Sequence, residues 1–427
     1  MIAALFVTFM VLLVLEMPVS FSLLIATIVA MVLYSKIDLI TVIVNMFSAT
    51  SNFSLLAVPF FILAGGFMER GGISRRLVAF ASNAVGHIRG GLANTSVVAA
   101  MFFAGLSGAA AADTAAVGSL LIPAMKKKGY GKDISTSVMA TAGSIGIVIP
   151  PSIPMIILGV TAGVSIGGLF MGGVIPGILM GVALMVVNYI YTRIRKIEPE
   201  PRATFKETVR SFGDSLLALL TVVIIVGGIV FGIFTPTEAS IIASIYAFII
   251  GFFVYRELHL KDLPDILIKA AVTTGIVLLT IAAASSFGWI LAAEQIPAQI
   301  ASFLIALTGN KLVLLMLLNV FFIILGTFLD PSAIIIIVIP IIWPIVQKLG
   351  INPIHFGVMT IVNMAIGQCT PPVGIALFVA SGISGASLSE MLGTYMRYIG
   401  ALIVVLLVVT YVPVISLWLP GLTGYLK

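Results

Sequence analysis

The 427-residue chain has few charges and a single cysteine. Only 9% of its residues are charged while 60% are hydrophobic, and the mean hydropathy is +1.24. Soluble domains carry about 25% charged residues, so this composition excludes a soluble globular protein and predicts an all-α polytopic protein embedded in a lipid bilayer. The net charge of +6 is not distributed as a nucleic-acid-binding surface. The lone Cys369 excludes an internal disulfide.

The features of a cleavable secretory signal are also missing. The first apolar run, from Ile2 to Leu15, has neither a basic start nor a small-residue cleavage site. We therefore expect the first hydrophobic segments to be retained as membrane helices.

Glycine and proline interrupt two apolar segments that are long enough to cross a bilayer. Gly143 to Ser152 reads Gly-Ser-Ile-Gly-Ile-Val-Ile-Pro-Pro-Ser, and Ala365 to Gly374 reads Ala-Ile-Gly-Gln-Cys-Thr-Pro-Pro-Val-Gly. Because proline removes a backbone donor and disfavours helical backbone at the preceding residue, each segment predicts a broken helix. Free carbonyls are costly in hydrocarbon, and broken helices in both halves of a chain are typical of a transporter's binding site.

The two halves of the chain align without gaps when Gly105 is placed on Gly326. The same register places Pro123 on Pro344, Gly146 on Gly367 and Pro150 on Pro371, all of which are residues that set backbone geometry. In each half, a segment that we interpret as a re-entrant helical hairpin precedes the broken helix. The sequence therefore predicts two structural repeats, each with a hairpin and a broken helix.

Basic residues indicate how these segments lie in the membrane. Arg89 precedes the first hairpin segment and Lys126–Lys128 follows it, so a hairpin keeps both on the cytoplasmic face, as the positive-inside rule favours. With the N-terminus outside, 18 of the 22 basic residues fall in inside loops. We therefore predict periplasmic N- and C-termini. The first hairpin then opens from inside and the second from outside, which makes the repeats inverted.

This topology divides the chain into seven segments. They are N-terminal scaffold helices at 1–68, an interfacial arm helix at 69–90, the first hairpin, broken helix and following span at 91–192, a cytoplasmic linker at 193–213, scaffold helices at 214–255, the arm and span of the second repeat at 256–310, and the second hairpin, broken helix and last span at 311–427. The scaffold segments lie outside the hairpin units, so we expect them to be static.

Several motifs together resemble one known family. They are Thr235-Pro236-Thr237-Glu238-Ala239, the hairpin tip at 107–113, Ile122-Pro123-Ala124-Met125 and the two broken helices. As a set they are similar to the large membrane subunit of TRAP transporters, the DctM family, over essentially the whole chain. The resemblance implies a sodium-driven, elevator-type importer of a carboxylate-bearing solute, such as a C4-dicarboxylate or sialic acid, in the bacterial inner membrane. It also implies a small four-helix membrane subunit, expected as a separate chain, and a periplasmic substrate-binding protein.

Oxygen-rich sites are expected where each hairpin tip meets its broken helix, because unwound backbone carbonyls coordinate Na⁺ in sodium-coupled transporters. The candidate Na⁺ ligands are Ser107, Gly108, Ser144 and Gly146 in the first half and Gly326, Thr327, Gly367 and Thr370 in the second. Close helix packing by small residues is the alternative explanation. It does not explain a proline pair inside two spans.

Candidate contacts to an anionic solute lie at the helix N-termini that follow the breaks, where the backbone supplies positive potential. These candidates are Ser152, Asp330, Asn363 and Gly374. The alternatives are a helix cap for Asp330 and an interhelical hydrogen bond for Asn363. Asp113 is a further intramembrane carboxylate, and its role stays open between capping and function.

Two alternative functions remain. A stand-alone sodium/carboxylate carrier of the same architecture would need no binding protein. An intramembrane serine protease is suggested by Gly105-Leu106-Ser107-Gly108. However, a serine nucleophile needs a base, and His259 and His355 lie at predicted membrane edges, far from Ser107. We therefore expect a transporter and not an enzyme.

Overall fold

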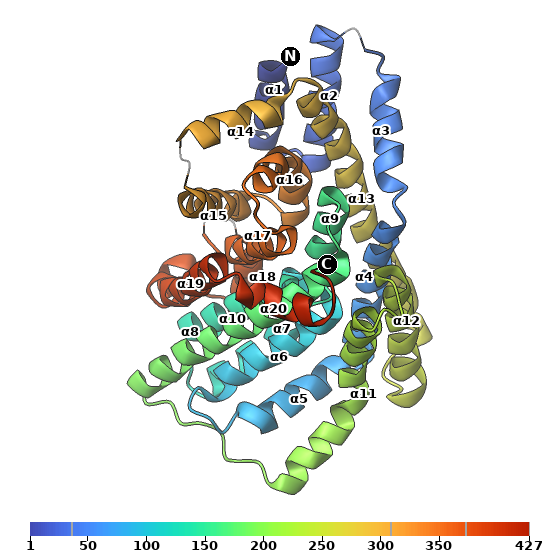
Figure 1. Ribbon diagram of the computed structural model, residues 1–427. Coiled ribbons are helices and arrows are strands. Elements are labelled where there is room, and N and C mark those ends of the chain that lie inside the picture. Colours follow the sequence, from blue (N-terminus) through green and yellow to red (C-terminus); the bar gives the residue numbers. More distant parts are fainter. Residues whose placement is uncertain (36, 308–309, 372–373, 427) are drawn as a thin grey trace.

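The computed structural model describes residues 1–35, 37–307, 310–371 and 374–426, and within these residues the chain is helical without any strand (Figure 1). Eight helical segments of this part of the chain are long and apolar enough to cross a membrane. The all-α membrane architecture expected from the composition is confirmed.

The described residues of the first half form ten α-helices. They are α1 (Ile2–Val14), α2 (Val19–Tyr34), α3 (Ile40–Thr50), α4 (Ala57–Arg70), α5 (Ile73–Val85), α6 (Gly91–Ser107), α7 (Ala110–Lys127), α8 (Lys132–Ser144), α9 (Ile153–Ala162) and α10 (Ile166–Ile194), with 3-10 turns at Phe53–Leu56 and Ile145–Ile147. Helices α6 and α7 form the first hairpin. Helices α8 and α9 are the two parts of the first broken helix.

The second half has the same order of elements. It contains α11 (Phe205–Val230), α12 (Pro236–Ile249, continued by a π-helical turn at Ile250–Val254), a 3-10 turn at Leu260–Asp262, α13 (Leu263–Ala293), α14 (Ile296–Leu307), α15 (Lys311–Phe328), α16 (Pro331–Lys348), α17 (Pro353–Gly367), α18 (Ile375–Ser384), α19 (Leu388–Tyr411) and α20 (Val414–Leu422). Helices α15 and α16 form the second hairpin, and α17 and α18 form the second broken helix.

The helix boundaries follow the register that places Gly105 on Gly326. Helix α7 begins at Ala110 and ends at Lys127, and the corresponding α16 begins at Pro331 and ends at Lys348. The long α13 corresponds to α3 and α4 together, which the first half interrupts at Ser51–Asn52. In Figure 1, α5 and its counterpart α14 lie at opposite ends of the molecule, an arrangement consistent with an inverted repeat. The orientation of each repeat in a membrane stays a prediction.

The Thr-Pro-Thr-Glu-Ala motif builds the start of α12 and connects it to the first half. Thr235 Oγ1 accepts the backbone N–H of Glu238 at 3.3 Å, and the Glu238 carboxylate accepts the N–H of Thr235 at 2.7 Å. This reciprocal pair is a capping box, with Pro236 in the first helical position. Thr237 Oγ1 then donates to the carbonyl of Phe53 at 3.2 Å. Because α12 also packs along α4, the motif holds these two parts of the chain together.

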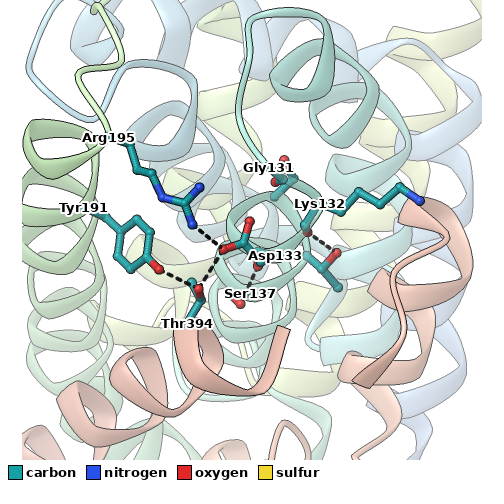
Figure 2. A network of polar contacts seen from close by, with 9 residues as sticks. Gly131, Lys132, Asp133, Ser137, Tyr191, Arg195 and Thr394 are labelled. Atoms are coloured by element: carbon teal, nitrogen blue, oxygen red, sulfur yellow. Dashed lines mark hydrogen bonds and ion pairs between the residues drawn. The ribbon is translucent and has the colours of Figure 1, made fainter. Parts of the chain in front are cut away.

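A polar network joins the two halves at one end of the hairpin units (Figure 2). Asp133, at the start of α8, accepts hydrogen bonds from Arg195 Nη2 at 3.3 Å and from Thr394 Oγ1 of α19 at 2.7 Å. Thr394 also bonds the Tyr191 hydroxyl of α10 at 2.6 Å. These contacts fix α8, α10 and α19 to one another, so residues of both repeats belong to one packed body.

Candidate functional site

The first hairpin tip touches the first break at a glycine. Helix α6 ends at Ser107, and Gly108 follows with a left-handed backbone, φ 63°. A Cβ at Gly108 would lie 2.7 Å from the carbonyl oxygen of Pro151 and 3.3 Å from Ser152 Cα. Only glycine combines this backbone conformation with so close an approach. The structure thus brings predicted residues of the tip and the break together.

The hydroxyl groups in the first break are used to build the break itself. Ser152 Oγ donates to the carbonyl of Ile147 at 2.5 Å and accepts the N–H of Met155 at 3.3 Å, which caps α9. Ser144 Oγ donates to the carbonyl of Thr141 at 2.8 Å within α8. Ser152 therefore holds the unwound backbone in place, and the hydroxyl of Ser144 has a partner within its own helix.

Asp113 provides the unusual electrostatic feature of this region. It lies at the start of α7 and is completely buried. Its Oδ1 accepts a hydrogen bond from Ser107 Oγ, whereas its buried Oδ2 has no hydrogen-bond partner among the described residues. A Cβ on Gly146 would overlap this free oxygen, so the carboxylate lies directly against the first break. A buried charge without compensation is costly, so this carboxylate needs neutralisation, either by a proton or by a cation from outside the chain.

A cavity of about 270 Å³ opens beside this carboxylate. Helices α4 and α13 line one side, and the first hairpin and α9 line the other. The polar residues of its lining are Glu69, Arg70, Ser107, Asp113, Asp265, Lys269 and Thr273. Asp265 pairs with Arg70 at 3.2 Å and with Lys269 at 3.1 Å, whereas Ser107 and Asp113 pair with each other. The cavity therefore lies where a scaffold segment faces a hairpin tip.

The second hairpin contacts the second break through two glycines. A Cβ on Gly367 would lie 2.6 Å from Gly326 Cα, and one on Gly326 would lie 3.0 Å from Gly367 Cα. Thr327 Oγ1 donates to the carbonyl of Ile324 at 2.7 Å, within its own helix. Glycine at both positions lets the α15 and α17 backbones touch. The structure thus brings Gly326 and Gly367 into contact, with Thr327 next to Gly326 in the chain; their role in ion binding stays a prediction.

Other candidates of the second half have local partners. Thr370 Oγ1 donates to the carbonyl of Ile366 at 2.7 Å, and a Cβ on Gly374 would lie 3.1 Å from the carbonyl oxygens of Gln368 and Thr370. The carbonyls around the second break thus face Gly374. Pro372 and Val373, on which the predicted break and helix N-terminus also depended, lie outside the described residues.

Asp330 and Asn363 occupy the positions that their alternative roles require. Asp330 is exposed at the tip of the second hairpin, and its Oδ1 accepts the N–H of Ser332 at 2.8 Å, which caps α16. Asn363 is buried and donates to Asn319 Oδ1 at 2.8 Å, which joins α17 to α15. A cap and a transport role can coexist at Asp330. Asn363 Nδ2 also donates to the carbonyl of Met359 at 2.9 Å, whereas its buried Oδ1 has no hydrogen-bond partner among the described residues.

The sequence leaves the role of Asp113 open. The structure places this residue between Ser107 of the first hairpin tip and Gly146 of the first break. The available signal was a single acid within an otherwise small and apolar stretch, Gly105 to Thr114. The same region tests the protease alternative. Ser107 Oγ donates to a carboxylate, whereas Nδ1 of the buried His355 pairs with Ser416 Oγ at 2.7 Å. The geometry of a serine nucleophile and its histidine base is therefore not formed here.

Comparisons with known proteins agree on one family. The family model described as tripartite ATP-independent periplasmic transporter, DctM component, matches residues 6–415. The C4-dicarboxylate TRAP transporter large permease protein DctM of Pseudomonas aeruginosa is 43% identical over 392 residues, which cover 92% of each chain. The sialic acid TRAP transporter large permease protein SiaM of Vibrio cholerae is 39% identical and covers 96% of each chain.

Two further similarities concern a longer relative and a solved structure. The isethionate TRAP transporter permease protein DctMQ of Oleidesulfovibrio alaskensis is 42% identical over 98% of this chain and 66% of that protein. The crystal structure of the Alcanivorax borkumensis YdaH transporter covers 93% of this chain and 96% of that chain, with a TM-score of 0.56 and 15% identity. At this identity the likeness to YdaH shows a shared fold.

Proposed function

Since the chain belongs to the DctM family of TRAP transporter large permeases, we propose that it is a sodium-coupled importer of an organic anion that works by an elevator movement. The observation that supports this most directly is the free Oδ2 of Asp113, buried against Gly146 and beside the cavity. A carboxylate, the Ser107 hydroxyl and unwound backbone carbonyls are all oxygen ligands, which suit a hard cation such as Na⁺. Gly326 and Gly367 bring a second group of backbone oxygens together.

The solute is proposed to be a small organic acid. The names of the three relatives specify a C4-dicarboxylate, sialic acid and isethionate, which share a negative charge. Bound Na⁺ at Asp113 would neutralise the buried carboxylate and leave the neighbouring cavity less repulsive to an anion. The solute would then enter the cavity between α4, α13 and the first hairpin.

For the elevator movement, we propose that the chain divides into a moving and a static part. The Asp133 network and the buried pair of Asn188 with Tyr398, at 2.6 Å, hold helices of both repeats in one body. The helices α1–α4 and α11–α12 take no part in these two contacts and are proposed to form the static scaffold. A small membrane subunit is proposed to pack on these scaffold helices, and a periplasmic binding protein is proposed to deliver the solute.

Reconstitution tests this function. The chain is placed in liposomes with its small subunit, and uptake of C4-dicarboxylates, sialic acid and isethionate is measured with and without the binding protein. We expect uptake that requires both an inward Na⁺ gradient and the binding protein. Full uptake driven by a proton gradient without Na⁺ contradicts sodium coupling. Equal uptake without the binding protein favours the stand-alone carrier.

The inverted topology has its own test, in a Cys369→Ala background. Lys127→Cys and Lys348→Cys occupy corresponding positions at the ends of α7 and α16. A membrane-impermeant thiol reagent added to whole cells or to inverted vesicles should label the two positions from opposite faces of the inner membrane. Labelling of both from the same face contradicts the inversion.

A further inference from the structure

A basic pocket with a volume of about 370 Å³ lies where two connecting segments meet. One segment is the corner between α5 and α6, and the other consists of the last turn of α10 and the residues that follow it. The lining residues are Arg89, Thr192, Arg193, Lys196, Ile197, Glu198 and Pro199. Both segments lead from the hairpin unit of the first repeat toward the scaffold. The pocket therefore lies apart from the cavity beside Asp113.

The three cations of this pocket are not paired with any acid among the described residues. In the part of the chain that the structure describes, the side chains of Arg89, Arg193 and Lys196 form neither a salt bridge nor a hydrogen bond. Neighbouring cations do have partners: Lys128 pairs with Glu200 at 3.0 Å, and Arg195 pairs with Asp133 at 3.3 Å. With Glu198 as the single acid of the lining, the pocket has a formal charge of +2. It is suited to an anion.

The backbone holds the pocket in shape. The N–H of Ile197 donates to the carbonyl of Thr192 at 3.0 Å, and Lys196 has a left-handed backbone, φ 55°. This is a helix-ending turn in which glycine is usual, because a side chain is disfavoured at that φ. The N–H of Glu200 then donates to the carbonyl of Gly86 at 3.0 Å, which joins the two segments. Lys196 thus has a backbone conformation that favours glycine, in a loop that two backbone hydrogen bonds hold in place.

Simpler roles for these cations do not explain their convergence. Cations near a helix C-terminus interact favourably with its dipole and can bond the last carbonyls. No such bond from Arg193 or Lys196 is present in the described structure. A topology anchor needs positive charge on the cytoplasmic side but no concave site.

The surroundings favour a lipid over a soluble anion. Ile194 is 67% exposed and Ile190 is 51% exposed, both on the last turns of α10, and Ile88 beside Arg89 is 42% exposed. Ile88 and Ile194 are chain neighbours of the lining residues Arg89 and Arg193, and Ile190 lies one turn earlier in α10, which is a candidate membrane span. Basic pockets at the cytoplasmic side of membrane helices suit acidic phospholipid headgroups. We propose that this pocket binds the phosphate headgroup of an anionic phospholipid of the cytoplasmic leaflet, with acyl chains along Ile190 and Ile194.

Binding to the purified chain tests this proposal without reference to transport. Native mass spectrometry measures the affinity for phosphatidylglycerol and for zwitterionic phosphatidylcholine. The pocket variant is Arg89→Gln with Lys196→Gln, and the matched control is Lys206→Gln with Arg210→Gln, two exposed cations of α11 outside the pocket. Each cation near an anionic lipid contributes about fivefold in affinity, so the pocket variant should bind phosphatidylglycerol roughly 25-fold more weakly. The control should bind as the unaltered chain does.

Three results overturn the proposal. They are unchanged phosphatidylglycerol affinity in the pocket variant, an equal loss in the control, and equal affinity of the unaltered chain for both lipids. A further arm adds inorganic phosphate or glycerophosphoglycerol, which carries the headgroup without acyl chains. If either binds as tightly as the lipid, the ligand is a soluble anion and the lipid assignment is wrong. Thermal unfolding of both variants should match that of the unaltered chain, and a lower midpoint for the pocket variant alone assigns its cations to folding instead.

Discussion

Replacing Gly367 by alanine should separate the second hairpin from the second broken helix. A Cβ at this position would lie 2.6 Å from Gly326 Cα and 2.7 Å from its carbonyl carbon, whereas ordinary contact begins at 3.4 Å. The opposing atoms belong to the backbone, so a side-chain rotation cannot relieve the overlap. Helices α15 and α17 would have to move apart by about 0.8 Å, the difference between 3.4 and 2.6 Å.

The cost follows from the density of a packed interior. Inserting one methyl group into a well-packed contact destabilises a protein by about 1–3 kcal/mol. Gly382→Ala is the matched control, because a Cβ there meets no heavy atom within 4 Å and the position lies within α18. Alanine is favoured over glycine within a helix by about 0.5–1 kcal/mol. The two substitutions should therefore change stability in opposite directions.

Thermal unfolding of the purified variants measures the change in stability, and sodium-dependent uptake measures the change in transport. We expect Gly367→Ala to unfold at a lower temperature and to transport more slowly, because the proposed second ion site lies at this contact. Gly382→Ala should unfold at the same or a higher temperature and transport normally. A Gly367→Ala variant as stable as the control would show that the hairpin and the break do not touch, which would refute the reasoning.

Three further substitutions test single side chains. Asp113→Asn keeps the shape of the side chain and the partner Ser107 but removes the charge, so the Na⁺ concentration for half-maximal uptake should rise at least about tenfold; an unchanged value would remove Asp113 from the ion site. Asp330→Asn should fold normally, because asparagine caps a helix as well as aspartate does, yet lose most uptake; near-normal uptake would leave Asp330 a helix cap only. Asp133→Ala breaks two hydrogen bonds, of which the one from Thr394 joins the two repeats, and should lower the free energy of unfolding by about 1–2 kcal/mol. Thermal unfolding is compared with the exposed Asp214→Ala, and equal stability would argue against the network.

Much of the fold could be predicted from local sequence. Apolar runs gave the helical class, and proline and glycine placed the breaks, because these residues act on the backbone wherever they occur. The gap-free alignment of the halves related Gly326 and Gly367 to Gly105 and Gly146, and the structure shows helix ends in the same register. Gly108 was predicted near the contact of tip and break, and the structure gives the reason for glycine there, a left-handed backbone and a close approach to Pro151.

The roles of the polar side chains depended on the tertiary structure. The sequence identified two acids near the hairpin tips, Asp113 and Asp330. The alignment of the halves does not place one on the other, and the residues around them do not show which acid is buried. Asp113 lies against Gly146, far from it in the chain, and beside a cavity whose other wall comes from α4 and α13. Asp330 caps its own helix in an exposed tip. Backbone geometry is encoded by neighbours in the chain, so the sequence alone determined the breaks and the repeat. The pairing of a carboxylate with a distant backbone depends on how whole helices pack, and only the tertiary structure decided it.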